Sequence, residues 1–385
     1  MIEQFPRGKS AIVGSATFGM GEAHGYSALD MAVKASHQAL QQANISLPEV
    51  DALFVATGDD ALSGLAAAEY LGIQPRFTDN NRTGGSAFSS HAITAAIMLE
   101  AGYIDTALIM YGSNQRSGAG GLVSMRQASP YEKPYRPLNP LSSYALAAAR
   151  HMHEYGTTEQ HLAEVAVAAR AWANLNPDAF MFGKPLSIED CLQSRLVSDP
   201  LRKSDCCLIT DGAAAIVMTR ADRAKDLVPT PVYLLGGAAA LWHNGVDQMH
   251  DLTVTPAKES GERAYALAGY TPSDIDVVNV YDAFSINTIL FLEDLGFCAK
   301  GDGGPFVEGG HIAPEGSLAV NTNGGGLSCC HPGMYGLFTI VECCQQLQGQ
   351  AQGRQIDNAQ LALSHANGGT LSSQATLILG TEQTL

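Results

Sequence analysis

Short apolar runs alternate along this chain with longer segments of helical spacing. The runs ALFVA (52–56), ALIMY (107–111), DVVNVY (276–281) and LALSHA (361–366) are continuous, as in strands buried on both faces of a sheet. The segments between them have the length and spacing of covering helices. This pattern predicts an α/β protein with parallel strands and helices packed over the sheet.

A weak internal repeat divides the chain into two similar halves. In the first half, VDALFVATG (50–58) precedes a Gly-rich turn, an apolar helix and the strands TALIMYG and DGAAAIVM. In the second half, IDVVNVYDA (275–283) precedes NTNGGG, another apolar helix and the strands LALSHANGG and SSQATLILG. Self-similarity of this kind indicates duplicated supersecondary units that pack against each other.

The repeat also sets the expected domain boundaries. The N-terminal half comprises residues 1–114 and 206–225, and the C-terminal half comprises residues 226–385. Residues 115–205 interrupt the first half as an inserted loop or cap domain. Long insertions in a compact α/β core commonly form lids or ligand-binding walls.

Two Gly-rich turns mark the expected ligand site. Gly84-Gly85 in the first half and Gly324-Gly325-Gly326 in the second each lead from a strand toward an apolar helix. Because the first N–H groups of a helix have no partner within the helix, each turn can present donors to an anion. The repeat predicts that both turns face one shared cleft.

Charge and composition narrow the function classes. A formal net charge of -16 opposes nonspecific binding to nucleic acid or anionic lipid. The chain has no run of about 18 uncharged apolar residues, the length that a membrane-spanning helix needs, and MIEQFPRGKSAIVG does not resemble a secretory signal. We therefore expect a cytoplasmic enzyme that binds neither nucleic acid nor membrane.

The cysteines are unevenly placed. All eight follow residue 190, none forms a CxxC pair, and six of them form three adjacent pairs. Adjacent side chains in a strand or helix point in different directions, which argues against a metal cluster. We expect reduced, mostly buried thiols, no metal site and no cofactor bound to this chain.

Four motifs follow one another in a characteristic order. They are DPLRKSDCCLITDGAAAIV, YDAF (281–284), VNTNGGGLSCCHPGMYG (320–336) and SHANGG (364–369). In this order they resemble the thiolase superfamily, specifically the branch related to sterol carrier protein thiolases. The resemblance covers essentially the whole chain and implies a thiolase fold, with two related β-α-β halves in a layered α/β/α/β/α core. It also implies that His331 is the family's active-site histidine.

The chain departs from this family at both catalytic cysteines. The turn that carries the nucleophile reads NNRTGGSAF here, with Arg82 or Thr83 at the cysteine position. Arg is permanently protonated, and Thr has no basic partner apparent in the sequence. The segment of the second cysteine contains His365, Ala366 and Asn367 instead. Thiolase chemistry needs a thiolate at these positions, so it is excluded.

A pocket that stabilises an enolate but lacks the sulfur nucleophile suits retro-aldol cleavage. A base takes the proton of a β-hydroxyl, the Cα–Cβ bond breaks, and the thioester enolate is protonated at carbon. The cysteine-free, tyrosine-bearing pattern resembles the bacterial steroid side-chain aldolases, which cleave a β-hydroxyacyl-CoA to a ketone or aldehyde and a short acyl-CoA. A CoA thioester is therefore the expected substrate.

The candidate catalytic residues are Tyr281, Tyr335, His331 and His365. Tyr281 follows a buried strand, and Tyr335 lies one helical turn beyond His331 if that segment is helical. Which tyrosine is the base stays open, because a free tyrosine has a pKa of about 10. Substrate contacts are expected from a second set of residues: Arg82, Gly84, Gly85, Asn323, Gly325, Asn367 and Gly368.

Three alternatives stay open at this level. Arg82 could contact a substrate phosphate or thioester oxygen, or could instead pair with Asp79. The chain could be an acyltransferase with another nucleophile, such as Ser86 or Cys330. It could also be a catalytically silent scaffold that binds acyl-CoA.

The resemblance further implies partners. Relatives form homodimers and associate with a small subunit that carries an OB fold and a zinc ribbon, which gives a heterotetramer. This sequence shows no obvious Lys/Arg cluster for the CoA phosphates. Such a subunit could supply the positive charge.

Overall fold

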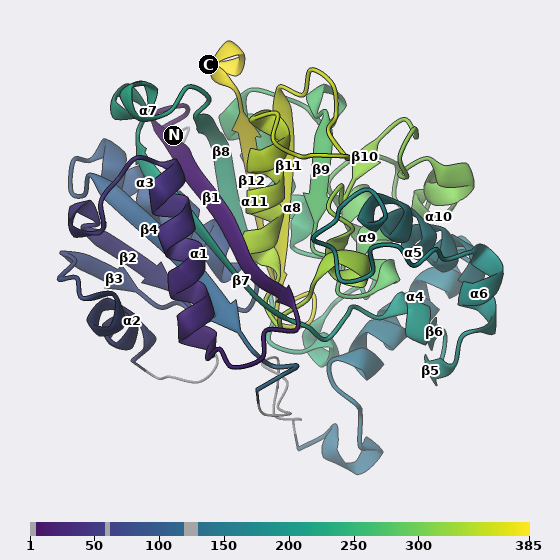
Figure 1. The fold of residues 1–385 in the computed structure, drawn as a ribbon. Coiled ribbons are helices and arrows are strands. Elements are labelled where there is room, and N and C mark those ends of the chain that lie inside the picture. Colours follow the sequence, from purple (N-terminus) through teal and green to yellow (C-terminus); the bar gives the residue numbers. More distant parts are fainter. Residues whose placement is uncertain (1–4, 58–61, 119–129) are drawn as a thin grey trace.

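The computed structural model describes residues 5–57, 62–118 and 130–385. A large central sheet holds the strands in the order β10-β9-β11-β12-β8-β1-β7-β4-β2-β3 (Figure 1). These strands are β1 (Ser10–Gly21), β2 (Ala52–Val55), β3 (Phe77–Asp79), β4 (Thr106–Ser113), β7 (Asp211–Arg220), β8 (Val232–Leu241), β9 (Val277–Val280), β10 (Ala319–Val320), β11 (Leu361–Gly368) and β12 (Ser373–Gly380).

The sheet consists of two five-stranded halves with matching strand order. The first half reads β3-β2-β4-β7-β1 and the second reads β10-β9-β11-β12-β8. The halves join where β1 pairs with β8, Ala11 opposite Tyr233 and Ile12 opposite Val232. The matching order confirms the duplication that the sequence repeat predicts.

The prediction of parallel strands is correct for only part of the sheet. Strand β2 is parallel to β3 and β4, and β9 is parallel to β10 and β11. By contrast, β7 is antiparallel to β1 and β4, and β12 is antiparallel to β8 and β11. Only residues 369–372 connect β11 to β12. A link this short is compatible with a hairpin and too short for a parallel crossover.

Helices form the layers around the sheet. The helices are α1 (Ala28–Gln42), α2 (Ser63–Leu71), α3 (Ala87–Glu100), α4 (Leu141–Tyr155), α5 (Glu159–Ala173), α6 (Ile188–Gln193), α7 (Ala221–Leu227), α8 (Ala257–Ala268), α9 (Ser285–Asp294), α10 (Gly303–Val307) and α11 (Gly336–Leu347). Helices α3 and α11 touch each other and strands of both halves, whereas α1 packs on β1, β4 and β7 and α8 on β8 and β12. Nearly all of α11 is buried, as a middle layer requires. This arrangement fits the predicted layered α/β/α/β/α core.

The segment between β4 and β7 carries α4, α5, α6 and a small hairpin of β5 (Leu196–Ser198) and β6 (Leu201–Arg202). Helix α5 packs against α9 and against the turn Gly325–Cys329 of the second half. The inserted segment therefore forms a wall beside the second Gly-rich turn. No helix within the described ranges is long and apolar enough to cross a bilayer.

The two Gly-rich turns differ from each other. Helix α3 begins at Ala87, directly after Gly84-Gly85, as predicted. The expectation that the second turn leads directly into a helix is wrong: Gly325–Cys329 forms a single π-helical turn, and α11 begins only at Gly336. Residue 330 is extended and Gly333 has a φ of 90°, so the chain cannot continue as a helix there.

Candidate active site

Tyr281 and His331 form the centre of the candidate active site. Tyr281 follows the end of β9, and its N–H donates to the carbonyl of His365 at 3.0 Å. Its hydroxyl oxygen lies 3.0 Å from Nε2 of His331 and 3.3 Å from the carbonyl oxygen of Gly333, so its single proton can be donated to either acceptor. The two rings meet edge to face with centroids 5.5 Å apart. Two residues 50 positions apart are thus in direct hydrogen-bond contact.

Two residues far away in the sequence, Thr210 and Gln115, hold the backbone of His331. Its N–H donates to Oγ1 of Thr210 at 2.9 Å, and its carbonyl accepts from Nε2 of Gln115 at 2.7 Å. Burial lowers the pKa of the imidazole to about 4. His331 is therefore neutral near pH 7, and one of its nitrogens can accept a proton.

Tyr335 completes the cluster from the start of α11. Its ring centroid lies 5.7 Å from that of Tyr281 in an edge-to-face arrangement. Its hydroxyl donates to Oδ1 of Asn323 at 2.9 Å, and the same oxygen accepts from the N–H of Gly325 at 2.8 Å. The segment between Tyr335 and His331 is not helical, so the condition for a helical pair is not met. They still meet, with ring centroids 6.3 Å apart.

Both phenols are buried, which sets their chemistry. Tyr281 is 5% exposed and Tyr335 is 1% exposed. Burial raises the pKa of both hydroxyls well above the ordinary value of a tyrosine. Each phenol is therefore a proton donor at rest, and neither becomes a free phenolate near pH 7.

Glycines allow the backbones to approach the tyrosines. A Cβ at Gly85 would lie 2.2 Å from Cε2 of Tyr281, and a Cβ at Gly84 would lie 2.7 Å from Cα of Gly368. A Cβ at Gly368 would lie 1.7 Å from the carbonyl oxygen of Thr83. The first Gly-rich turn, the segment of Gly368 and the ring of Tyr281 are thus in close contact, and only glycine fits at these positions.

Asp282 supports the second Gly-rich turn. Its carboxylate accepts from the N–H of Gly326 at 2.5 Å and from that of Leu327 at 3.2 Å. A Cβ at Gly325 would lie 2.0 Å from Oδ2 of Asp282. Burial outweighs these hydrogen bonds and raises the pKa of Asp282 to about 7. Gly325 thus allows a buried carboxyl group to hold the turn beside Tyr335.

The structure does not bring His365 into this cluster. Its two ring nitrogens lie 2.9 Å from Oγ1 of Thr376 and 2.9 Å from Oε1 of Gln374, and burial lowers its pKa to about 3. Asn367 belongs to the same network. Its Oδ1 accepts from Gln374 at 2.8 Å, and its Nδ2 donates to the hydroxyl of Tyr144 at 2.9 Å.

Arg82 lies apart from the buried cluster. Its side chain is exposed at the turn before α3. The possible partner Asp79 is engaged elsewhere: it accepts from the N–H of Asn81 at 3.0 Å and lies 3.9 Å from His91. This position leaves Arg82 available to a ligand that approaches from solvent.

Similarity to known proteins places this site in a family. A family model described as "Thiolase C-terminal domain-like" matches residues 238–381. The 17-hydroxy-3-oxo-4-pregnene-20-carboxyl-CoA lyase of Mycobacterium tuberculosis is 33% identical over 363 residues, which cover 89% of this chain and 92% of that protein. The steroid side-chain-cleaving aldolase of Thermomonospora curvata is 31% identical, over 98% of this chain and 99% of that protein. The chain belongs to the thiolase superfamily.

Other members of the superfamily agree in fold but differ in chemistry. The acetyl-CoA acetyltransferase of Methanothermobacter thermautotrophicus is 34% identical over 96% of this chain and 98% of that protein. A solved structure of an "Ltp2-ChsH2(DUF35) aldolase" superimposes with a TM-score of 0.90 at 30% identity, over 98% of this chain and 99% of that chain. Because both activities occur among these relatives, the residues at the site must decide between them.

The environments of the alternative nucleophiles Ser86 and Cys330, and of the second cysteine position, do not favour acyl transfer. Ser86, at the start of α3, is buried, and its hydroxyl lies 2.8 Å from the hydroxyl of Ser373 and 3.2 Å from the carbonyl oxygen of Thr83. In the second segment, Ala366 directs its Cβ toward Gly336, at the start of α11. Burial raises the pKa of the Cys330 thiol well above its usual range. A buried thiol of this kind is a poor nucleophile.

Several supporting residues were not identified from the sequence. Thr210 and Gln115 hold the backbone of His331, and Tyr144 extends from α4 to Asn367. The sequence around these three residues has no periodicity or motif spacing that would mark them as part of a site. The only available hint was the prediction that the inserted segment forms a wall of the ligand site. Tyr144, which packs on Phe284 with ring centroids 4.5 Å apart, comes from that segment.

Proposed function

We propose that this protein is a carbon–carbon lyase that cleaves a β-hydroxyacyl-CoA by a retro-aldol reaction. The proposed products are a ketone or aldehyde and a short acyl-CoA, and the proposed substrate class is a CoA thioester of a steroid side chain. The observation that carries the proposal is the 3.0 Å contact between Tyr281 and neutral His331 in a site without a cysteine nucleophile. The names of two relatives, at 31% and 33% identity, support the same reaction.

Tyr281 and His331 act together as the base. A buried phenol whose pKa is strongly raised stays protonated in the resting enzyme, so it is not a base on its own. It can, however, pass its proton to Nε2 of His331 while it takes the proton of the substrate's β-hydroxyl. The Cα–Cβ bond then breaks, the oxygen becomes a carbonyl, and the electron pair moves into the thioester enolate.

Tyr335 acts as the acid. Its raised pKa keeps the hydroxyl protonated until the enolate forms, and it then donates a proton to the α-carbon. Tyr335 regains a proton and His331 loses one before the next turnover, so the reaction consumes no proton overall. The start of α3, at Gly84-Gly85 beside the ring of Tyr281, is the proposed site of the thioester oxygen, since a helix N-terminus favours the negative charge of a developing enolate.

The remaining candidate residues have supporting roles in this proposal. Exposed Arg82 contacts the CoA part of the substrate. Asn323 and Gly325 hold the hydroxyl of Tyr335, and Gly368 leaves room for the first Gly-rich turn. Asn367 and His365 stabilise strand β11 beneath the site rather than transfer protons.

Acyl transfer is the second candidate function, because a relative at 34% identity is named an acetyl-CoA acetyltransferase. The hydrogen bonds of Ser86 and the raised pKa of Cys330 argue against it. A silent acyl-CoA-binding scaffold is the third candidate. The phenol–imidazole contact argues against a scaffold, since a site without catalysis gains nothing from such a pair.

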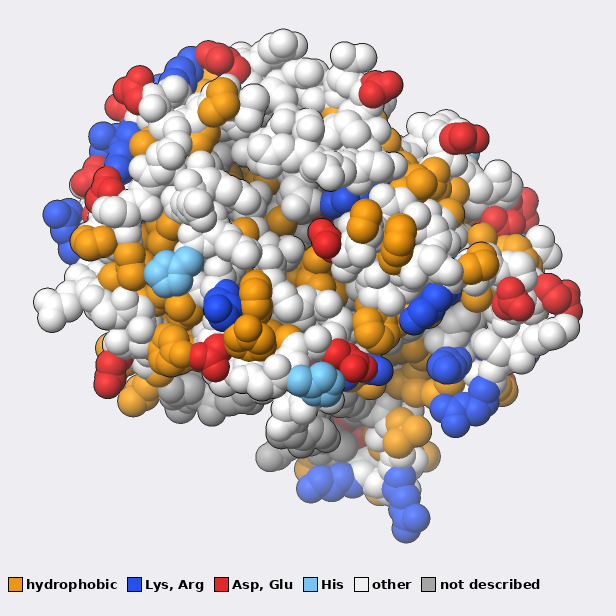
Figure 2. Space-filling model, viewed as in Figure 1, with side chains coloured by type: hydrophobic (Ala, Val, Ile, Leu, Met, Phe, Trp, Pro, Cys, Tyr) orange, Lys and Arg blue, Asp and Glu red, His pale blue; other side chains and the backbone are white. Residues whose placement is uncertain are grey.

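We also propose a cytoplasmic assembly of two copies of this chain with two copies of a small subunit that carries an OB fold and a zinc ribbon. The related solved structure, which is named as an aldolase of two components, Ltp2 and ChsH2(DUF35), supports a second component. On the face shown in Figure 2, acidic and basic side chains are mixed at the upper left, and several Lys and Arg side chains lie near one another toward the lower right. A partner that supplies positive charge would help to hold the CoA phosphates.

One experiment separates the three functions. The purified protein, alone and co-expressed with a candidate small subunit, is incubated with β-hydroxyacyl-CoA thioesters that carry steroid and simpler acyl groups. We expect a ketone or aldehyde and a shorter acyl-CoA in equal amounts. A covalent acyl-enzyme would indicate a transferase, and binding without products in either preparation would indicate a scaffold.

A further inference from the structure

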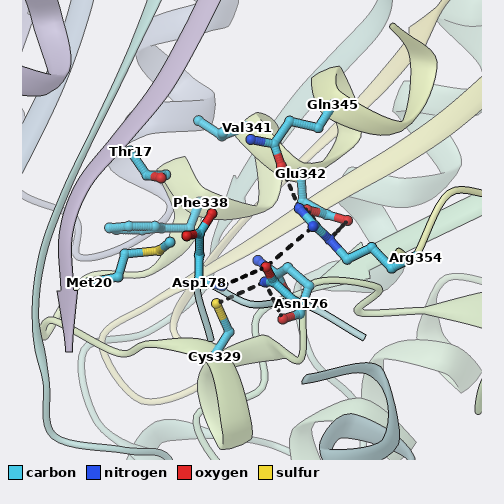
Figure 3. A pocket seen from close by; sticks show the side chains of 11 residues that line it. Thr17, Met20, Asn176, Asp178, Cys329, Phe338, Val341, Glu342, Gln345 and Arg354 are labelled. Atoms are coloured by element: carbon cyan, nitrogen blue, oxygen red, sulfur yellow. Dashed lines mark hydrogen bonds and ion pairs between the residues drawn. The ribbon is translucent and has the colours of Figure 1, made fainter. Parts of the chain in front are cut away.

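A small pocket lies between β1, the inserted segment and α11 (Figure 3). It is lined by Thr17, Met20, Asn176, Asp178, Asn323, Cys329, Phe338, Val341, Glu342, Gln345 and Arg354. Phe338 separates the pocket from the site, because its ring stacks on that of Tyr335 with centroids 5.6 Å apart. Two residues of the pocket lining, Asn323 and Phe338, thus contact the proposed acid directly.

A buried ion pair forms one side of this pocket. Nη2 of Arg354 lies 2.8 Å from Oε2 of Glu342, and Nε of Arg354 lies 3.0 Å from Oε1. Arg354 is 8% exposed and Glu342 is 2% exposed. Glu342 stands on α11, the helix that begins directly after Tyr335. The pair therefore ties this helix to the loop of Arg354.

Asn176 connects the ion pair to the acceptor of the phenol. Its Oδ1 accepts from Nη1 of Arg354 at 3.3 Å, and its Nδ2 donates to the carbonyl of Asn323 at 3.0 Å. Asn323 in turn accepts from the hydroxyl of Tyr335. Figure 3 shows Asn176 between Arg354 and Cys329. The contacts close a ring. It runs from Tyr335 along α11 to Glu342 and returns through Arg354, Asn176 and Asn323 to the Tyr335 hydroxyl.

Stability alone does not explain this ring. A buried ion pair gains little over well-packed apolar side chains, because both charges lose their hydration. The ring fixes the relative position of two parts of the site. One is helix α11, which begins directly after Tyr335, and the other is the Asn323 amide, which accepts from the Tyr335 hydroxyl. Charge-assisted hydrogen bonds of fixed geometry suit this purpose.

We propose that Asn176 and Arg354 are positioning residues for the proton donor Tyr335, so that the inserted segment controls the protonation of the enolate. This inference rests on the proposed function. Asn176 acts through the carbonyl of Asn323, and Arg354 acts through Asn176 and through Glu342. Neither side chain needs to touch the substrate.

The substitution Asn176→Asp tests the proposal, because it removes the Nδ2 donor that contacts the Asn323 carbonyl at 3.0 Å and Sγ of Cys329 at 3.7 Å. The new carboxylate still accepts from Arg354 but cannot donate to Asn323. We expect kcat to fall about tenfold to a hundredfold, with KM within about twofold of the wild-type value, because a small misplacement of a catalytic group costs rate rather than binding. The solvent deuterium isotope effect on kcat should rise as protonation at the α-carbon becomes slower.

The matched control is Thr157→Val, which removes a different buried hydrogen bond of the inserted segment, 2.8 Å from Oγ1 of Thr157 to His151. We expect its kcat and isotope effect to equal those of the wild type. The double variant Arg354→Met with Glu342→Gln removes the ion pair without leaving a charge unpaired, and it should behave like Asn176→Asp.

A second measurement does not depend on activity. With 3-fluorotyrosine placed at position 335, the ¹⁹F resonance should shift or broaden in Asn176→Asp and stay unchanged in Thr157→Val. An inactive wild type would contradict the proposed function, whereas the fluorine result would still test the positioning. An active wild type together with an Asn176→Asp variant of unchanged kcat, isotope effect and ¹⁹F resonance would overturn the inference.

Discussion

The hydroxyl oxygen of Tyr281 lies 3.0 Å from Nε2 of His331, inside a site from which water is largely excluded. The contact joins two groups whose pKa values burial moves apart, upward for the phenol and downward for the imidazole. Neither group alone is a good base near pH 7, but a proton can pass through the first to the second.

Replacing Tyr281 by Phe should abolish this transfer. We expect Tyr281→Phe to lower kcat by about 10² to 10⁴-fold, the usual contribution of a general acid or base, with little change in folding. Steady-state cleavage of a β-hydroxyacyl-CoA measures the effect. The control is Tyr103→Phe, since Tyr103 is 59% exposed and remote from the cluster. Full activity of the double variant Tyr281→Phe with Tyr335→Phe would rule out phenol catalysis altogether.

The loss of activity at low pH should reflect protonation of His331. The group must be neutral to accept a proton, so activity is lost as the pH falls through its folded pKa of about 4. We expect a fall in kcat/KM below about pH 5 from protonation of His331, separate from any change near pH 7, where the Asp282 carboxyl titrates. A fall due to His331 centred near the ordinary histidine value, about 6.5, would contradict a buried neutral imidazole.

Tyr335 should affect protonation of the enolate more than cleavage itself. In Tyr335→Phe, the carbon–carbon bond can still break, but the enolate must take its proton from another source. Protonation of the α-carbon then becomes the slow step. We expect a large loss of steady-state kcat together with a single-turnover burst of ketone or aldehyde. Rapid quenching measures the burst. Equal slowing of the burst and of the steady state would assign Tyr335 to the first step instead.

Gly85→Ala should disturb the site sterically. The added methyl group would meet the ring of Tyr281 at 2.2 Å, so the ring or the first Gly-rich turn must move. We expect a loss of about 1–3 kcal/mol in unfolding free energy and at least about a hundredfold loss of kcat. The control Gly212→Ala places its methyl 3.4 Å from the nearest atom, in Pro332, and should cost far less in both measurements.

His365 offers a prediction about stability. Its folded pKa of about 3 lies below the unfolded value of about 6.5, so the unfolded state binds more protons at acid pH. Stability is therefore lost as the pH falls below about 6.5, by up to about 1.4 kcal/mol per pH unit from this residue. Denaturant unfolding at pH 7 and pH 5 should show a smaller loss in His365→Gln than in the wild type.

Kinetics of the same variant settle the role of His365. We expect His365→Gln to keep its kcat within about tenfold of the wild-type value, because both ring nitrogens already have partners within the protein. A loss comparable to that of Tyr281→Phe would instead support the catalytic role that the sequence suggested.

The sequence supports much of this picture. The internal repeat predicts the duplicated halves, and the motif order predicts the thiolase fold. The absence of cysteine before residue 191 excludes thiolase chemistry at the first turn. The structure places Tyr281, His331 and Tyr335, three of the predicted catalytic residues, in one cluster.

The remaining features could not be read from the sequence, for physical reasons. Strand direction depends on how each connection runs in space. A short link makes β12 antiparallel to β11, but β7 is antiparallel to β4 across the long inserted segment, and no local pattern reveals that direction. The spacing between His331 and Tyr335 suits a helix, but Pro332 and the positive φ of Gly333 prevent one. The partners of His365 and the role of Asn176 arise from contacts between distant segments, which leave no periodic pattern.

The pairing of β1 with β8 should determine how the protein unfolds. Because one hydrogen-bonded ladder crosses from the first half into the second, and α3 and α11 touch strands of both, neither half keeps its core when the other is lost. The described halves should therefore melt in a single cooperative transition, and either half expressed alone should fail to fold.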